Sequence, residues 1–407
     1  MFLNILWKTV KGRWYSLARK TQQELEKIIK ENKVSRLFSW SRYNCYKTSP
    51  FEYFLRYVKK EKATRNNIYS VVGSNVHDIV ESFYDGKTKY EDMINEYQSA
   101  FLNATILELK FNREDDDKNE KIEEKYNACI EHFFRNHKPI EHKIVLEKYL
   151  LIWINKFLFG GYFDAVHKDE NGNYIVTDWK SSTIYTGKKI DKEKGQLLLY
   201  SEGLRQLGIP LDKIKARWNF LKYLDITYPL KKIDENGNNA TKTTHAERHA
   251  WFGKIKTNAK MWLKDSGRYT EEEINDMLNY SLEFNTMENL PKDIQDLYKI
   301  EDCYIEAPVT DEEIDNLKED IYQTLVEIHI KERDYEKTGD DTVFWEEVTD
   351  ANSYYFANLC GYNAIQHKPY GKYLDDRELF IDDEYKTNKN RTEVENDDNS
   401  WLKELGL

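Results

Sequence analysis

The sequence lacks the features of a membrane protein, a zinc ribbon or a disulfide-rich protein. Its 407 residues include four cysteines, which are widely spaced and form no C-x-x-C pair, so neither a zinc ribbon nor a disulfide framework is expected. No apolar run approaches the roughly 20 residues that a membrane-spanning helix needs. The apolar start of the chain also lacks the order of a signal peptide. We therefore expect a cytoplasmic protein with reduced thiols and no membrane partner.

An excess of basic charge is missing as well. The formal net charge is -11, with 61 Lys and Arg against 72 Asp and Glu. This sign counts against nucleic-acid binding, although whole-chain charge says little about a local groove where basic residues gather. What the sequence has instead is length and many aromatic residues, 29 Tyr and 10 Trp. Such a chain forms one large domain with insertions, or two domains.

The middle of the chain has the pattern of an α/β unit. From Ile144 the sequence is rich in strand formers, and Asn171-Gly172 lies between two such segments, which predicts a β-hairpin. An amphipathic helix then ends near Gly208 and a further strand follows. The predicted elements are a helix over 73–86, hairpin strands over 161–166 and 174–179, a helix over 192–208 and a strand over 214–224.

The flanking regions are mostly helical in pattern, and neither an internal repeat nor a P-loop is present. The charged run Arg113–Lys121 is interpreted as a solvated loop, and 229–335 begins with a polar loop before its helices. The predicted parts are an N-terminal helical segment (1–34), a core (35–228) with a helical insert at about 88–140, a mostly helical accessory insertion (229–335), a C-terminal segment packing on the core (336–384) and a polar tail expected to be disordered (385–407).

Acidic and basic residues near the ends of the hairpin strands form a candidate catalytic group. Lys180 follows Asp178 by two positions, so both side chains leave the same face of the second strand. The hairpin can bring Asp164 close to Asp178. Two neighbouring carboxylates repel unless they are protonated or bind a metal, and oxygen ligands suit Mg²⁺ or Mn²⁺. Such a metal can activate a water, which Lys180 would orient.

The same residues also allow an ordinary interpretation. A D-x-K sequence is very common, and on its own it describes a hairpin with surface acids and a salt-bridged lysine. The choice between the two depends on the surrounding motifs.

Those motifs resemble the RecB-type branch of the PD-(D/E)xK nucleases, which includes phage exonucleases and CRISPR-adaptation nucleases. The resemblance covers roughly residues 35–225 and consists of ordered matches, each weak alone. They are Ser39-Trp40-Ser41-Arg42, Ser49-Pro50-Phe51-Glu52-Tyr53, Gly73 with Val76 and His77, Glu147, Gly161 with Asp164, Asp178 with Lys180, and Gln196 with Tyr200.

The resemblance implies a fold, an activity and a set of site residues. The fold would be a restriction-endonuclease-like core, a mixed central sheet flanked by helices, with a helical insertion. The activity would be Mg²⁺- or Mn²⁺-dependent hydrolysis of DNA in recombination, repair or end processing. The implied metal ligands are His77, Asp164, Asp178 and the backbone carbonyl of Trp179.

Further residues of the implied site stay open between two roles. Gln196 and Tyr200 share a helix face and would lie at the rim of the site, or belong to an ordinary half-buried helix. His77 alone would suggest a core histidine; the resemblance favours a ligand. Arg42 is a candidate DNA contact. The stretch 251–264 is another, although a buried amphipathic helix suits it as well.

Two departures and one rejected motif complete the sequence interpretation. Many relatives hold an iron–sulfur cluster through four cysteines, but Ser49 replaces the first and the C-terminal segment keeps only Cys360. We therefore expect no cluster. His245 and His249 have the spacing of a helical zinc pair without the H-E-x-x-H order, so a solvated helix face is predicted.

The expected partners are DNA, as single strands or duplex ends, and a recombination or replication protein. A phage-encoded chain would act in the host cytoplasm. The alternative function is a catalytically silent subunit of the same fold that binds DNA or a partner protein.

Overall fold

The computed structural model describes residues 20–379, which divide into two compact units. The first unit comprises the described residues up to Leu37, Val72–Leu107 and Glu120–Lys318. The second comprises Phe38–Val71, Glu108–Asn119 and the described residues from Glu319. The predicted N-terminal segment lies partly outside the described residues, and the predicted polar tail lies wholly outside them. The predicted domain boundaries stay a prediction.

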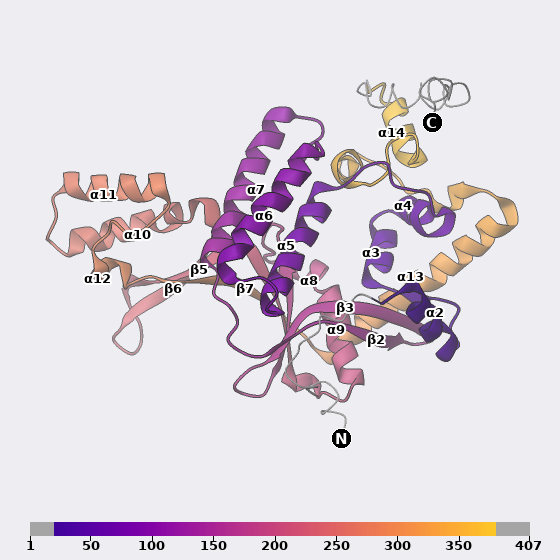
Figure 1. Cartoon of the computed structure of the whole chain (residues 1–407), viewed down its shortest axis with the longest axis horizontal. Helices are drawn as coiled ribbons and strands as arrows, with labels where there is room; N and C mark the ends of the chain where they lie inside the picture. The colour runs from indigo at the N-terminus through magenta and orange to yellow at the C-terminus, as the bar shows by residue number, and fades with distance from the viewer. Residues whose placement is uncertain (1–19, 380–407) are drawn as a thin grey trace. The chain divides into compact units, whose positions relative to one another are not determined.

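The first unit is built on a mixed seven-stranded sheet with the order β1-β3-β4-β5-β6, in which β2 also pairs with β3 and β7 with β5 (Figure 1). The β4–β5 pair is parallel, and the other registers described are antiparallel. The strands are β1 Leu37–Phe38, β2 Ile144–Ile154, β3 Phe157–Lys168, β4 Tyr174–Lys180, β5 Ile214–Ile233, β6 Asn239–Glu247 and β7 Lys299–Ala307. Helices flank this sheet, so the predicted fold class is confirmed.

Helices fill the rest of the described chain, some of them crossing from one unit to the other. The α-helices are α2 Gln22–Glu31, α3 Trp40–Thr48, α4 Pro50–Tyr53, α5 Ile68–Tyr84, α6 Met93–Ile106, α7 Asp116–Asn136, α8 Lys188–Glu193, α9 Gly195–Gln206, α10 Phe252–Asp265, α11 Glu271–Phe284, α12 Lys292–Gln295, α13 Asp311–Thr338 and α14 Lys368–Asp376. Short 3₁₀ segments are Tyr90–Asp92, Leu211–Lys213, Arg248–Ala250 and Asp341–Phe344, and π-helical segments are Phe54–Lys59 and Tyr355–Leu359. Within the described part of the chain, no helix combines the length and apolarity needed to cross a bilayer.

The hairpin predicted around Asn171-Gly172 is confirmed. Gly172 has a φ of +81°, which glycine adopts without strain, and its N–H donates to the Asp169 carbonyl at 3.0 Å. The Asp169 side chain accepts from the Asn173 N–H at 2.8 Å. This turn fixes the register in which Val166 faces Val176. Because register decides which side chains share a face, the turn positions the carboxylates described below.

Two other local predictions need correction. The charged run Arg113–Lys121 is not a loop throughout, because α7 begins at Asp116, where Asp116 and Asp117 favour a helix N-terminus. The region after Leu224 contains more strand than expected, since β5 continues to Ile233 and pairs with β6 and β7. β6 is polar because most of its residues are exposed, so no hydrophobic alternation marks it.

The accessory segment of the first unit has a core of its own. Helices α10, α11 and α12 pack against β5 and β6 through buried residues that include Ile226, Trp251, Phe252 and Leu278. Helices α10 and α11 lie side by side beyond the sheet (Figure 1). Trp251 is therefore a core residue, which confirms the buried-helix alternative for that position.

The second unit joins α3 and α4 to the C-terminal part of the described chain. Ser49 caps α4 by accepting the Glu52 N–H at 3.0 Å, and its hydroxyl donates to Glu346. The Ser49 Oγ also lies 3.1 Å from the Nε2 of His367, which is fully buried. Polar side chains therefore tie the start of this unit to its end.

Candidate active site

The two candidate carboxylates lie where the β3–β4 ladder ends. The last paired residues are Ala165 and Thr177, so Asp164 and Asp178 come directly after the regular pairing. The Asp164 carboxylate takes the place of the next backbone acceptor, because the Trp179 N–H donates to its Oδ2 at 2.9 Å. This hydrogen bond fixes one oxygen of Asp164 beside the backbone of β4.

Lys180 lies beside the second carboxylate. Its Nζ is 2.7 Å from the Oδ2 of Asp178. Burial alone would lower the pKa of Lys180, but the charges of Asp178 and Asp164 outweigh that effect and raise the pKa above its ordinary value. Lys180 is therefore a fixed cation at neutral pH. Its side chain is 25% exposed while that of Asp178 is 3% exposed, so the ammonium lies on the solvent side of the carboxylate.

Asp164 occupies a site that disfavours its negative charge. Burial and the charge of Asp178 raise its pKa to about 6, against the opposing effects of His77, Lys180 and the Trp179 N–H. A partly buried carboxylate beside a second carboxylate is stabilised by a proton or by a bound cation. A further positive charge, in addition to that of Lys180, would therefore stabilise the ionised carboxylates.

His77 is brought to the same place by α5. Its Nδ1 lies 3.6 Å from the Oδ2 of Asp164, and its ring meets the Trp179 ring edge-on at a centroid distance of 6.0 Å. The apolar face of α5 is anchored by Val76, which is fully buried, and Tyr84 stacks on Trp179. His77 itself is 27% exposed. Its imidazole is thus held at the edge of the site with access to solvent.

The residues present fit a divalent metal by their chemistry. Asp164, Asp178 and His77 offer oxygen and imidazole ligands, which suit Mg²⁺ or Mn²⁺ and tolerate related ions. The buried Oδ2 of Asp178 is paired with the Lys180 ammonium, and a carboxylate has further lone pairs that a metal ion can use. However, the donor atoms of these three residues do not all lie within 4.8 Å of one another. Among the described residues that condition is met by a different cluster, which is described below. Side-chain movement is therefore required for these three to converge on one ion.

Helix α9 supplies Gln196 and Tyr200. The Gln196 Nε2 donates to the Tyr200 hydroxyl at 3.1 Å, and Tyr200 is 5% exposed. Burial first, and then the charges of Asp164 and Asp178, raise the pKa of Tyr200, which shows that its hydroxyl is near the carboxylates. A Cβ on Gly161 would come within 3.2 Å of the Tyr200 ring. The absence of a side chain at Gly161 therefore makes room for this tyrosine.

Glu147, the acidic residue matched in the sequence, lies in β2. Its neighbours pair as Leu146 with Ala165 and Lys148 with Phe163, so the register places Glu147 opposite Asp164. Glu147 has a φ of +39°, which is unusual for a residue with a side chain. Backbone strain of this kind occurs often at functional positions.

Arg42 lies in the second unit, where its guanidinium has partners within the protein. It donates to the Tyr53 hydroxyl at 2.9 Å and lies over the Tyr57 ring at 4.8 Å. Glu332 is 3.7 Å away, and the Arg42 side chain is 15% exposed. Its predicted role in binding DNA stays a prediction.

A second cluster of metal-binding residue types was not predicted from the sequence. Asp225, His245 and Cys303 bring their donor atoms within 4.8 Å of one another. The interpretation of His245 as part of a helix is wrong, because His245 lies in β6 and the strand ends at Glu247. The donors come from separate strands, so no local spacing in the sequence indicates them.

Comparison with known proteins agrees with the fold. The model of the PD-(D/E)XK nuclease superfamily matches residues 37–339, which include all the candidate site residues. No curated protein matches the chain. Since the match covers well over half of the sequence, the chain belongs to the PD-(D/E)XK nuclease superfamily.

Proposed function

We propose that this protein is a Mg²⁺- or Mn²⁺-dependent deoxyribonuclease of the RecB-like branch that acts on DNA ends. Membership of the superfamily supports a nuclease. The observation that carries the proposal is the Lys180 ammonium, which lies 2.7 Å from Asp178 and beside a second carboxylate, Asp164, whose pKa is raised to about 6. A structural salt bridge needs one carboxylate for each lysine, whereas here Asp164 is a second carboxylate beside the pair of Asp178 and Lys180.

The metal would be held by Asp164, Asp178 and His77, with the backbone carbonyl of Trp179 as a further ligand. A bound divalent ion supplies a Lewis acid for the phosphoryl oxygen and lowers the pKa of a coordinated water. Asp164 is already oriented by the Trp179 N–H, which leaves its other oxygen for a cation.

Lys180 would position the attacking water and offset the negative charge that develops on the phosphate. Its ammonium can turn from Asp178 toward a water because it is one quarter exposed and carries three donors. In-line attack on the phosphorus would leave a 5′-phosphate and a 3′-hydroxyl. Gln196 and Tyr200 would line the rim and orient the substrate through polar contacts.

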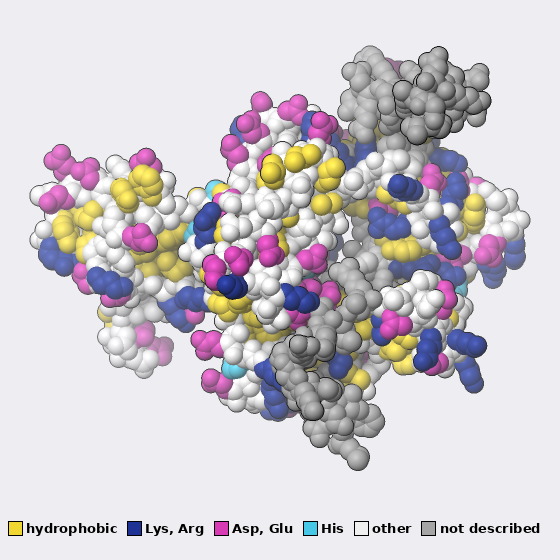
Figure 2. All heavy atoms as spheres, viewed as in Figure 1, with side chains coloured by type: hydrophobic (Ala, Val, Ile, Leu, Met, Phe, Trp, Pro, Cys, Tyr) yellow, Lys and Arg dark blue, Asp and Glu magenta, His cyan; other side chains and the backbone are white. Residues whose placement is uncertain are grey.

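DNA binding is proposed to depend on local charge. Lys and Arg side chains are interspersed with Asp and Glu on the face shown in Figure 2. The net charge of -11 therefore arises from a mixed surface and leaves room for local basic contacts. Contacts with phosphates would make binding weaken as salt rises.

We further propose that the protein holds no iron–sulfur cluster. Ser49 stands where relatives have a cysteine, and its hydroxyl is engaged by Glu346 and His367. Protein purified without oxygen should be colourless and should contain no stoichiometric iron by elemental analysis. A brown protein with a broad visible absorption band would contradict this.

The proposed function is tested with end-labelled linear DNA and closed circular DNA of the same sequence. We expect degradation of the linear substrate that requires Mg²⁺ or Mn²⁺ and stops with a chelator, while the circle survives. Cleavage of the circular DNA would show that the protein is an endonuclease and would contradict the proposed action on DNA ends. Tight DNA binding without cleavage under any metal would favour the alternative function, a silent binding subunit.

A further inference from the structure

Three adjacent strands at the far end of the sheet bring a carboxylate, an imidazole and a thiol together. Asp225 lies in the central strand β5 and pairs directly with His245 of β6. On its other side Asp225 pairs with Glu301 of β7, and Cys303 follows two residues later. Since side chains alternate along a strand, Asp225, His245 and Cys303 all leave the same face of the sheet.

The distances between the donor atoms are close to those of a metal site. The His245 Nδ1 lies 2.6 Å from the Asp225 Oδ1 and 3.7 Å from the Cys303 Sγ. Tetrahedral zinc with a bond of about 2.3 Å to sulfur and about 2.0 Å to nitrogen or oxygen requires donors roughly 3.3 to 3.7 Å apart. The sulfur–nitrogen distance already meets this requirement. The nitrogen–oxygen pair would open by less than an ångström.

The burial of the three residues is also that of a site with one open side. Cys303 is fully buried, the Asp225 side chain is 20% exposed and the His245 side chain is 39% exposed. An ion can therefore enter beside His245 and reach the buried sulfur. A fourth position facing solvent would remain for water.

We propose that Asp225, His245 and Cys303 form a Zn²⁺ site that is separate from the nuclease centre. Cysteine and histidine ligands select zinc, whereas Mg²⁺ and Mn²⁺ prefer oxygen. On binding, the Cys303 thiol releases its proton to solvent and a sulfur–zinc bond forms, with no change of oxidation state.

The alternative is that these three residues bind no ion. Asp225 and His245 would then form an ordinary ion pair, with the Cys303 thiol donating to the carboxylate. Burial and the neighbouring Asp225 raise the pKa of Cys303, so the free thiol keeps its proton.

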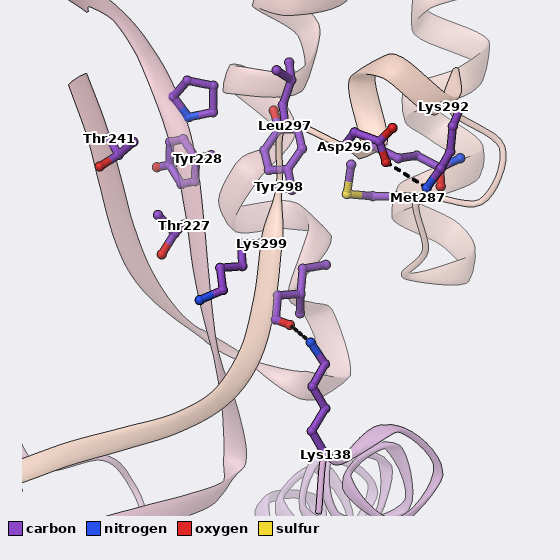
Figure 3. A pocket seen from close by; sticks show the side chains of 13 residues that line it. Lys138, Thr227, Tyr228, Thr241, Met287, Lys292, Asp296, Leu297, Tyr298 and Lys299 are labelled. Carbon is purple, nitrogen blue, oxygen red and sulfur yellow. Dashed lines mark hydrogen bonds and ion pairs between the residues drawn. The ribbon is translucent and has the colours of Figure 1, made fainter. Parts of the chain in front are cut away.

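A metal ion at this site would link strands β5, β6 and β7, against which the helices of the accessory segment pack. Two residues beyond Asp225, Thr227 lines a cavity of about 610 Å³ together with Tyr228, Tyr298 and Lys299 (Figure 3). This cavity is formed by the same strands β5, β6 and β7 and by the segment around α12. Zinc at Asp225 would hold these strands in register at the point where the β5–β7 pairing is irregular.

The test is a titration of the full-length, metal-stripped and reduced protein with Co²⁺, followed by displacement with Zn²⁺. Cobalt bound to a thiolate gives a near-ultraviolet charge-transfer band, which the carboxylate and histidine ligands of the nuclease centre cannot produce. We expect one equivalent of this band in the wild type, its loss on adding Zn²⁺ and no loss on adding excess Mg²⁺.

Variants assign the band to its residues. Cys303→Ala should abolish it, and His245→Gln, which alters an exposed side chain, should weaken Co²⁺ binding by more than the roughly 10- to 100-fold typical of outer-shell partners. Cys129→Ala is the matched control, because Cys129 is also buried and lies 3.5 Å from a histidine, His249. This control should keep the band.

The proposal is overturned if the wild type shows no thiolate band, or if the band survives in Cys303→Ala. It is also overturned if His245→Gln binds Co²⁺ like the wild type. His245→Gln decides the matter where Cys303→Ala does not fold.

Discussion

At the scale of single residues, the candidate centre combines charges that are unfavourable without a counter-ion. Asp178 is almost fully buried, Asp164 has its pKa raised to about 6, and one lysine serves both. A hydrophobic core of the same volume would be no less stable, since buried ion pairs contribute little net stability. The arrangement therefore supports the proposed metal site, because it adds little to the stability of the fold.

His77 provides the first prediction at this scale. His77→Ala should weaken Mn²⁺ binding, because the substitution removes a proposed metal ligand. The free energy of unfolding should stay nearly unchanged, because the side chain is partly exposed. Activity should partly return at higher Mn²⁺. Metal titration by calorimetry and thermal unfolding measure the two effects.

The control for this variant is His142→Ala, since His142 is an exposed histidine at the start of the β2 region. It should behave as the wild type in both measurements. Wild-type metal dependence of His77→Ala, or its failure to fold, would remove His77 from the ligand set.

The sequence indicated some of these residues and not others for a physical reason. Asp164, Asp178 and Lys180 lie on one hairpin whose register follows from a local turn at Asn171-Gly172, so their proximity was predictable. Asp225 and Cys303 meet His245 across separations of 20 and 58 residues. Their meeting depends on pairing between distant strands, which no local pattern specifies.

At the scale of secondary-structure elements, the close approach of α9 to the sheet positions the rim residues. A Cβ on Gly203 would lie 2.9 Å from the Ile152 side chain and 3.1 Å from that of Leu150. Gly203 is fully within α9, so the helix gives up some intrinsic stability there in exchange for close packing on β2. Tyr200 on the preceding turn depends on this placement.

Gly203→Ala should therefore lower the free energy of unfolding by about 1–3 kcal/mol, because the added methyl overpacks the interface with β2. The matched control is Gly253→Ala in α10, where the nearest atom is 4.0 Å away. That variant should be unchanged or stabilised by up to about 1 kcal/mol through helix propensity. Denaturant unfolding of both variants measures this difference. Equal free energies of unfolding for the two variants would contradict it and would show that α9 can shift away from β2 at little cost.

Elements were predictable where burial leaves a periodic pattern. Helix α5 was predicted from Val76, Ile79 and Val80, which the structure buries on one face. Strand β6 was missed because its exposed residues between Asn239 and Glu247 show no alternation. A mostly exposed strand is specified by its partner β5, and that information is not local.

At the scale of the whole molecule, a buried histidine makes stability depend on pH. His137 is 5% exposed, and neither ring nitrogen has a hydrogen-bond partner among the described residues. Its ring stacks on Phe133 and Tyr90. Burial lowers the pKa of His137 from 6.5 to about 4. The folded state therefore resists a protonation that the unfolded chain accepts.

The sign of the effect follows from this shift. Above the ordinary pKa of 6.5 both states are neutral and the full stability is present. As pH falls from about 6.5 to 4, the unfolded chain binds the proton first, so stability falls by up to about 3 kcal/mol. His137→Phe should reduce this acid sensitivity. Unfolding curves at several pH values test it, and parallel pH profiles for wild type and His137→Phe would refute it.

The central claim concerns the whole enzyme and rests on the different tasks of Asp178 and Lys180. Asp178→Ala removes a proposed metal ligand, so Mn²⁺ binding and cleavage should both be lost. Lys180→Ala leaves the ligands in place, because an ammonium does not bind a metal ion. Its Mn²⁺ affinity should stay close to that of the wild type, while its rate should fall roughly 100- to 1,000-fold with the loss of one electrostatic group.

The most direct measurement is therefore Mn²⁺ calorimetry paired with single-turnover cleavage of labelled linear DNA for both variants and the wild type. The account predicts that metal binding and cleavage are lost together in Asp178→Ala, and that cleavage alone is lost in Lys180→Ala. Cleavage by Lys180→Ala at the wild-type rate would contradict the account.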